Sequence, residues 1–276
     1  MIGPGQRNLR TVANPHTVRG FTLTEAVMVI VITGILAGMA AVFITQPVDQ
    51  FFDTARRATL ADAADTVLRR IGRDLRAALP NSVRVNPGNT ALEFLHVRSG
   101  GRYREQGPGD VLDFTGSDIT FDVLGPAVSV QPGDSVVVYN LGIPGATAYS
   151  GASANTDVRR VVSGAGGLLT NVAITSAARF PFASPARRFQ VVDTPVSYIC
   201  AGGVMTRYWG YTIAAAQPVP PVGALNALIA EGLTGCNFTY ASGTTQAQAL
   251  VTLSLALTDG GETINLLYQI HVNNVP

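Results

Sequence analysis

The hydrophobic pattern begins with one long run near the amino terminus. From Ala26 to Ile44, 19 residues, there is no charge, and Thr33 is the one clearly polar side chain. As an α-helix at about 1.5 Å per residue this run spans roughly 28 Å, close to the hydrocarbon thickness of a bilayer. The pattern therefore predicts a membrane-spanning helix, with Glu25 standing at its entrance.

A second pattern, with helical spacing, follows Pro47. Small and aliphatic residues recur three and four positions apart, which indicates a half-buried helix: Ala64, Val67, Leu68, Ile71, Leu75 and Ala78. The opposite face carries charges at i,i+4 spacing: Asp53 and Arg57, Asp65 and Arg69, Arg70 and Asp74. Pro47 predicts a disruption of the helix near Phe43, and Pro80 predicts its end. We expect one long helix whose second half packs against a domain.

From Asn81 onward the pattern is that of short strands. "ALEFLHV", "SGG" and "RYR" predict a strand, a turn and a returning strand, and "VSYIC", "AGG" and "VMTRYWGYTI" predict a hairpin. The clearest hairpin alternates over Val251–Leu257 and back over Ile264–Val272, around Asp-Gly-Gly. "ALNALIAEGL" predicts a short helix, and "QPVPPVG" a loop. A long amino-terminal helix followed by hairpins is an α+β fold with an antiparallel sheet laid over the helix.

The residues before the apolar run predict a removable leader. Met1 to Gly20 contains Arg7, Arg10 and Arg19 and no acid, so this segment is expected to stay in the cytoplasm. In a secretory signal peptide the cleavage site follows the apolar region, whereas here the small residue Gly20 precedes it. Cleavage at Gly20–Phe21 leaves the membrane span attached and places a new ammonium one helical turn from Glu25. The two charges attract strongly in a low dielectric; the alternative is an acid tolerated at the membrane boundary.

The run "RGFTLTEAVMVIVITGILA" resembles the processing and assembly segment of type IV prepilins and of type II secretion pseudopilins. The resemblance implies that a prepilin peptidase cuts after Gly20 and methylates the new amino group of Phe21. It also implies that Glu25 docks each subunit against an amino terminus during assembly into a filament. Major pilins of this family often carry a helix-bending proline where this chain has Val42, so their helix curvature is not carried over.

The resemblance also implies an organisation and a set of partners. Residues 1–20 are the cleaved leader, 21–46 the transmembrane and assembly helix, 47–80 its amphipathic second half, and 81–276 a periplasmic β-rich head. The expected partners are other pilin subunits, the prepilin peptidase, the inner-membrane pilus assembly machinery and the lipid bilayer. The expected location is the bacterial inner membrane and, after assembly, the filament.

The body of the chain resembles a minor pilin of the mannose-sensitive haemagglutinin (MSHA) pilus. The matching segments are "LRRIGRDLRAALPNSVRV", "GGRYR", "RFPFASPARRFQVVDTPVSYIC", "RYWGY" and "QIHVNNVP". The implied function is that of a structural subunit in pilus biogenesis or adhesion. Three alternatives stay open: a minor pseudopilin of type II secretion, a membrane-tethered periplasmic enzyme, and a DNA-binding pilin for uptake.

Composition narrows the function classes. All 19 basic residues are arginine, and removal of the three in the leader leaves 16 against 18 acids. That near-balance predicts no nucleic-acid partner. Cys200 and Cys236 lie in the part expected outside the cytoplasm, where an oxidising environment allows a disulfide; the alternative is two buried thiols.

Candidate chemistry beyond the leader is sparse. His96 and His271 lie in strand-like runs, which favours structural roles, and no catalytic motif, cofactor or metal site is predicted. The spacing of four aspartates does not fit a helix–loop–helix calcium loop: Asp110, Asp113, Asp118 and Asp122. Three aromatic residues are expected to pack beneath the sheet rather than form an adhesive surface: Tyr208, Trp209 and Tyr211.

Overall fold

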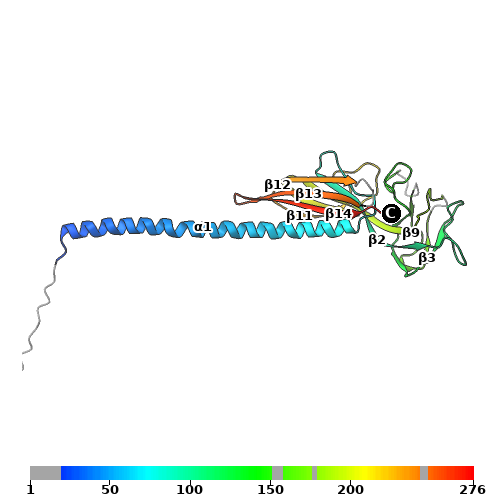
Figure 1. Cartoon of the computed structure of the whole chain (residues 1–276), viewed down its shortest axis with the longest axis horizontal. Helices are drawn as coiled ribbons and strands as arrows, with labels where there is room; N and C mark the ends of the chain where they lie inside the picture. The colour runs from blue at the N-terminus through cyan, green and yellow to red at the C-terminus, as the bar shows by residue number, and fades with distance from the viewer. Residues whose placement is uncertain (1–19, 151–157, 176–178, 243–247) are drawn as a thin grey trace, which may run out of the picture. The chain divides into compact units, whose positions relative to one another are not determined.

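The structure, a computed structural model, describes residues 20–150, 158–175, 179–242 and 248–276, and for residues 44–49 it describes the helical backbone alone. The leader arginines therefore lie outside the described residues. The chain divides into two compact units between Thr54 and Ala55. Helix α1, Leu23–Arg76, contributes its first part to one unit and its second part to the other (Figure 1).

Pro47 does not interrupt α1, so the predicted disruption near Phe43 is wrong. Proline removes one backbone donor, but the hydrogen-bonded turns on either side keep the backbone helical. Residues Leu23–Phe43 form a stretch that is long and apolar enough to cross a membrane, and none of it is buried within the chain. Apolar side chains cover this stretch on all sides, which is the pattern of a helix that needs an apolar environment.

The second part of α1 buries the predicted apolar face. Ala64, Val67, Leu68, Ile71 and Leu75 are all buried in one cluster with side chains from two sheets. Of the predicted charge pairs, Asp65 and Arg69 do form an ion pair, with 2.6 Å between Oδ2 and Nε.

Charged residues of two other predicted pairs contact the sheets. Arg57 pairs with Glu262 at the tip of the last hairpin. Asp74 turns away from Arg70 and accepts hydrogen bonds from Tyr198 and Arg207, both at 2.8 Å. Strand side chains that pack against the helix thus compete for its charged residues.

The larger sheet has nine strands, with the path β11-β10-β9-β2-β3-β8. β1 also pairs with β2, and β5 pairs with both β6 and β9. Every pairing is antiparallel. The strands are β1 Arg84–Val85, β2 Ala91–Tyr103, β3 Thr120–Leu124, β5 Ser135–Val137, β6 Arg159–Val161, β8 Asn171–Ala173, β9 Arg188–Ala201, β10 Val204–Trp209 and β11 Leu225–Ala230.

Strand β2 corrects the predicted turn at "SGG". It continues through Gly100 and Gly101 to Tyr103 and pairs along its length with β9, with shifts of register near Val97. A Cβ on Gly101 would lie 3.1 Å from Phe189, Val123 and Val128. The glycines therefore allow close packing within a strand instead of a change of direction.

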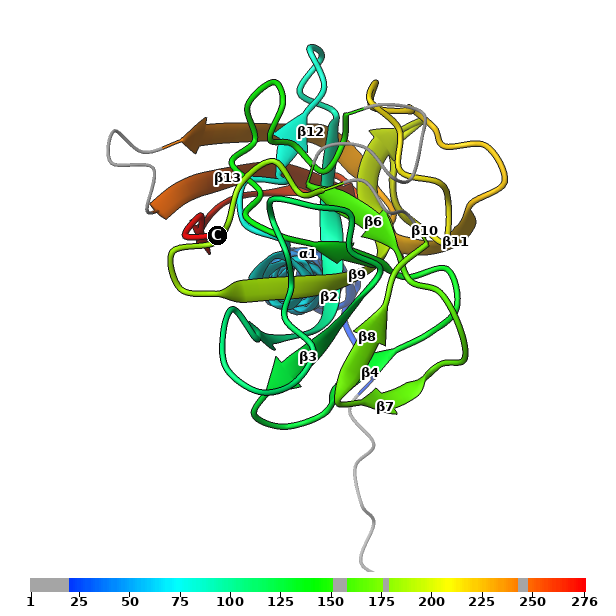
Figure 2. The same ribbon diagram turned by 90° about the vertical axis from the view of Figure 1, so that its right-hand side faces the viewer.

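The smaller sheet has the order β12-β13-β14, with bounds Leu233–Ser242, Gln248–Asp259 and Glu262–Asn273. The hairpin β13–β14 confirms the predicted alternation: Val251, Leu253, Leu255 and Leu257 are buried against α1 and its neighbours. Figure 2, which looks along α1, shows β12 and β13 on one side of the helix and β10 and β11 on another. The second part of α1 therefore packs its apolar face against two sheets and keeps its polar face exposed.

Of the remaining predicted elements, one is confirmed and one is wrong. The hairpin β9–β10 is confirmed. The short helix predicted at "ALNALIAEGL" is wrong, because Leu225–Ala230 forms β11 and pairs with β10. Backbone pairing with a neighbouring strand thus outweighs the helical propensity of alanine and leucine. A two-stranded ribbon, β4 Val128–Val130 and β7 Gly167–Leu169, completes the described strands and borders a second core cluster.

Candidate processing and assembly segment

Gly20 has no structural need to be glycine within this chain. A Cβ built on it meets no described atom within 4 Å, and its φ lies outside the left-handed region that favours glycine. The next residue, Phe21, is 75% exposed. Packing within the chain therefore explains neither the glycine at position 20 nor the phenylalanine at position 21.

Thr22 begins α1 as its N-cap residue. Its hydroxyl accepts a hydrogen bond from the Glu25 backbone N–H at 3.3 Å, and its carbonyl accepts one from the Ala26 N–H at 3.1 Å. Thr-Leu-Thr-Glu is thus a Ser/Thr-x-x-Glu start signal, which the sequence reasoning missed although the pattern was readable. Glu25 occupies the third helical position, where its charge also favours the positive end of the helix dipole.

The cap changes the expected geometry of the cut chain. Phe21 lies before the N-cap, so in the uncut chain it is not one helical turn from Glu25. Inclusion of Phe21 in the helix requires loss of the Thr22 cap. No described residue donates a side-chain hydrogen bond to the Glu25 carboxylate or forms an ion pair with it. The carboxylate is exposed and available for a cation from outside the chain.

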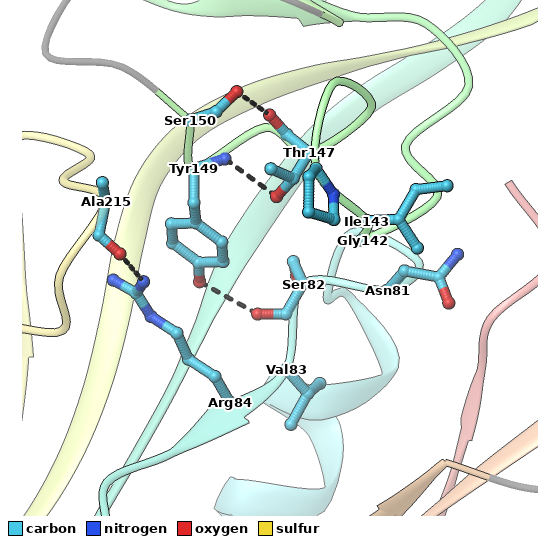
Figure 3. A pocket seen from close by; sticks show the side chains of 11 residues that line it. Asn81, Ser82, Val83, Arg84, Gly142, Ile143, Thr147, Tyr149, Ser150 and Ala215 are labelled. Carbon is cyan, nitrogen blue, oxygen red and sulfur yellow. Dashed lines mark hydrogen bonds between the residues drawn. The ribbon is translucent and has the colours of Figure 1, made fainter.

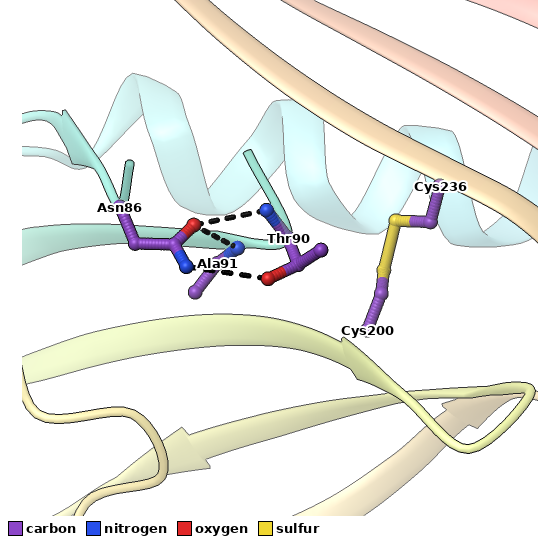
Figure 4. The surroundings of a disulfide bond; sticks show 5 residues. All are labelled: Asn86, Thr90, Ala91, Cys200 and Cys236. Carbon is purple, nitrogen blue, oxygen red and sulfur yellow. Dashed lines mark hydrogen bonds between the residues drawn. A yellow bond between two sulfur atoms is a disulfide. The ribbon is translucent and has the colours of Figure 1, made fainter. Parts of the chain in front are cut away.

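Cys200 and Cys236 form a disulfide in the structure. Cys200 lies on β9 of the larger sheet and Cys236 on β12 of the smaller one, so the bond joins the two sheets that pack against α1. Figure 4 shows the adjacent turn, in which the Asn86 side-chain oxygen accepts hydrogen bonds from the Thr90 and Ala91 N–H groups at 2.9 and 2.8 Å.

The other polar candidates have structural partners. His96 Nδ1 lies 2.8 Å from Asp193, and His271 is exposed on β14. The four aspartates form two separate pairs: Asp110 and Asp122 both accept from the Asn171 side-chain amide, and Asp118 accepts from the Asp113 N–H. No three metal-ligating side chains of His, Cys, Asp or Glu come together in the part of the chain that the structure describes.

The aromatic residues near β10 are partly buried. Trp209 packs against the core cluster and lies beside Arg207, whose Cζ is 4.9 Å from the ring centroid. The Tyr211 hydroxyl lies 2.6 Å from the Ser197 hydroxyl. These two contacts are structural.

A cavity of about 420 Å³ lies beside the end of α1 (Figure 3). Its polar groups are used by the fold: the Tyr149 hydroxyl donates to the Ser82 carbonyl at 2.9 Å, and Arg84 Nη1 donates to the Ala215 carbonyl at 2.6 Å. The Arg84 guanidinium also stacks on the Tyr149 ring, 3.7 Å from its centroid. The lining residues hold no nucleophile paired with a base.

Beneath this stack, Arg84 pairs with a fully buried acid, Glu93, at 2.8 Å. The second carboxylate oxygen of Glu93 has no hydrogen-bond partner among the described residues. Burial raises the pKa of Glu93 to about 7, against the opposing charge and hydrogen bond of Arg84. The sequence alone offered no signal for this pair, because nine residues and a turn separate its members.

Comparison with known proteins supports the predicted prepilin-like segment, and only that segment of the chain. Residues 16–41 match a family model described as a prokaryotic N-terminal methylation motif. No curated protein and no solved structure matches the chain. An apolar amino-terminal helix together with antiparallel sheets fits an α+β, pilin-like architecture.

Proposed function

We propose that this chain is a minor pilin of an MSHA-type IV pilus, cut after Gly20 by a prepilin peptidase and N-methylated on Phe21. The methylation motif supports the broader class, which contains pilins and pseudopilins and consists of structural subunits. The likeness of the body segments to the MSHA minor pilin MshO supports the narrower assignment. Residues 1–20 are then the leader, 21–46 the membrane and assembly helix, 47–80 the second half of that helix and 81–276 the periplasmic head.

The observation that carries this proposal is Gly20. Gly20 lies just before the helix start inside the matched methylation motif, where no described neighbour and no backbone angle of its own chain requires glycine. A peptidase that must bring the backbone close to its catalytic groups has that requirement. The exposed Phe21 and the unpaired Glu25 carboxylate, a few residues further on, fit the same use.

Assembly uses the apolar first part of α1 and Glu25. In the membrane, the exposed apolar side chains of Leu23–Phe43 lie in lipid. In the filament, the carboxylate of Glu25 meets the new amino terminus of a neighbouring subunit. An intermolecular pair requires no change in the Thr22 cap.

Intact-mass measurement tests the proposal. The chain is expressed in cells with and without an active prepilin peptidase and extracted from membranes. We expect the mass of residues 21–276 plus one methyl group with the enzyme, and full-length chain without it. Gly20→Leu should remain uncut, whereas Gly38→Leu, at another glycine with no neighbour within 4 Å, should be processed normally. Full-length chain in both strains would overturn the proposal.

A further inference from the structure

A groove of about 490 Å³ runs between the last turns of α1 and strand β14. Its floor is formed by Gly72 and Tyr268, because a Cβ on Gly72 would meet the Tyr268 hydroxyl at 3.4 Å. Its wall is formed by one acid, Asp65, and by Arg69, Arg73 and Arg76. These arginines stand at i, i+4 and i+7, so they share one face of the helix.

The positive charge of this wall is only partly balanced. Arg69 pairs with Asp65, but no described carboxylate lies within ion-pair distance of Arg73 or Arg76. Asp74, the acid between them in sequence, is held by Tyr198 and Arg207 on the other side of the helix. The helix dipole favours cations in the last turn, but like charges three and four residues apart repel one another.

The other side of the groove is an open strand edge. β14 pairs with β13, and within the described residues no backbone bond crosses its second edge. Asp259 and Glu262 close a two-glycine hairpin, so alternate residues of β14 direct N–H and C=O away from β13. These residues include Asn265, Leu267 and Gln269.

The strand and the helix run side by side in the same direction. Arg57 contacts Glu262 near the start of β14, Gly72 faces Tyr268, and Asn81 contacts Asn274 beyond its end. Alternate side chains on an added strand would lie about 6.6–6.8 Å apart; on the helix, Arg69 and Arg73 are separated by a rise of about 6 Å, and Arg73 and Arg76 by about 4.5 Å, a difference that long arginine side chains can span. The two spacings match closely enough for successive contacts.

We infer that this groove binds an extended acidic segment of a partner protein, which adds to β14 as a further strand. Its backbone pairs with the open edge, and its carboxylates at alternate positions meet Arg69, Arg73 and Arg76. A nucleic acid could use the arginines but not the strand edge. The inference goes beyond the proposed function, because it does not depend on cleavage at Gly20.

The test uses the uncut full-length chain in detergent. The probe is a fluorescent synthetic peptide in which glutamate alternates with valine, and the control peptide has glutamine in place of glutamate. We expect saturable binding of the glutamate peptide that weakens with added salt. Arg73→Gln combined with Arg76→Gln should weaken it by about tenfold or more, because charge-assisted hydrogen bonds from two arginines are lost. Arg70→Gln, on the same helix but outside the groove, is the matched control and should bind normally.

A second variant tests the strand edge. Leu267→Pro removes an N–H that faces away from β13, a position where an edge strand tolerates proline, and should also weaken binding. Asn265→Pro repeats the test if Leu267→Pro unfolds. Equal binding of the two peptides, or full binding by the double arginine variant, would overturn the inference. Binding that depends on the arginines but survives both proline changes, with a DNA duplex as an effective competitor, would overturn it in favour of a general polyanion surface.

Discussion

Arg84 and Glu93 form an ion pair in which the acid is fully buried and the arginine reaches three separate segments. From β1, Arg84 bonds Glu93 on β2, the carbonyls of Ala214 and Ala215, and the face of Tyr149. The Arg84 side chain therefore joins β1 and β2 to two loops that are distant in sequence.

The free energy of unfolding should increase as the pH falls through neutrality, because Glu93 takes up a proton in the folded chain. Its pKa is raised from 4.5 to about 7, so the folded chain holds this proton more tightly than the unfolded chain. The contribution, at most roughly 3 kcal/mol, is fully present below pH 4.5 and is lost as the pH rises through 7. Urea unfolding followed by the single tryptophan, at pH 5 and pH 8, measures the change.

Two variants separate the Glu93 effect from other groups. Glu93→Gln should reduce the difference between pH 5 and pH 8. Arg84→Met should destabilise the chain at pH 8 by about 3 kcal/mol or more, because it leaves a buried charge uncompensated. A wild-type difference that persists in Glu93→Gln would show that another group titrates.

Asp74 should stabilise the attachment of α1 to the larger sheet. Asp74→Ala leaves the Tyr198 hydroxyl and the Arg207 guanidinium without their acceptor, and should cost about 2–3 kcal/mol. Asp65→Ala, which breaks an exposed pair on the same helix, should cost less than about 1 kcal/mol. Equal losses in the two variants would contradict the role given to Asp74.

Burial and the negative charge of Asp74 raise the pKa of Tyr198. The Asp74→Ala variant should therefore bring the pKa of Tyr198 down toward its ordinary value. Ultraviolet titration of tyrosinate, with Tyr198→Phe as the reference, checks this direction.

The Cys200–Cys236 bond should contribute about 3–4 kcal/mol on the chain-entropy model for its separation of 36 residues. We expect the double serine variant to unfold at lower denaturant concentration than the oxidised chain. Reductant should lower the midpoint of the wild-type chain and leave that of the double variant unchanged. A wild-type midpoint that does not respond to reductant would contradict the prediction.

Thr22 should set the start of α1. Thr22→Ala should destabilise the first turn of α1 by about 1 kcal/mol. This loss should be measured as faster amide exchange at Glu25 and Ala26 in detergent. Thr22→Asp should keep the protection, since aspartate also caps. Thr33→Ala, which removes a hydroxyl that bonds within the helix, should leave exchange at the first turn unchanged.

Glu25→Ala should insert into the membrane and be processed, yet fail to enter filaments. Removal of the acid lowers the cost of insertion and abolishes the intermolecular ion pair. The measurement is the recovery of the subunit in sheared pili against its amount in membranes. Recovery equal to that of the wild-type chain would contradict the assembly role.

The sequence by itself determined the features that depend on near neighbours. The apolar run, the buried face of α1 and the Asp-Gly-Gly hairpin follow from side-chain period and turn chemistry, which a few adjacent residues decide. The candidate processing segment could be predicted from the sequence for a related reason. Gly20, Thr22 and Glu25 make no described tertiary contact beyond their own helix start, so no distant residue changes their meaning.

Only the tertiary structure decided which distant groups meet. Asp74 binds Arg207 across 133 residues instead of Arg70 four residues away, "SGG" continues a strand, and "ALNALIAEGL" pairs with β10. The buried pair Arg84–Glu93 and the arginine groove beside β14 arise in the same way. In each case the free energy gained by burial and strand pairing in the whole fold exceeds the few tenths of a kcal/mol by which local spacing favours another arrangement.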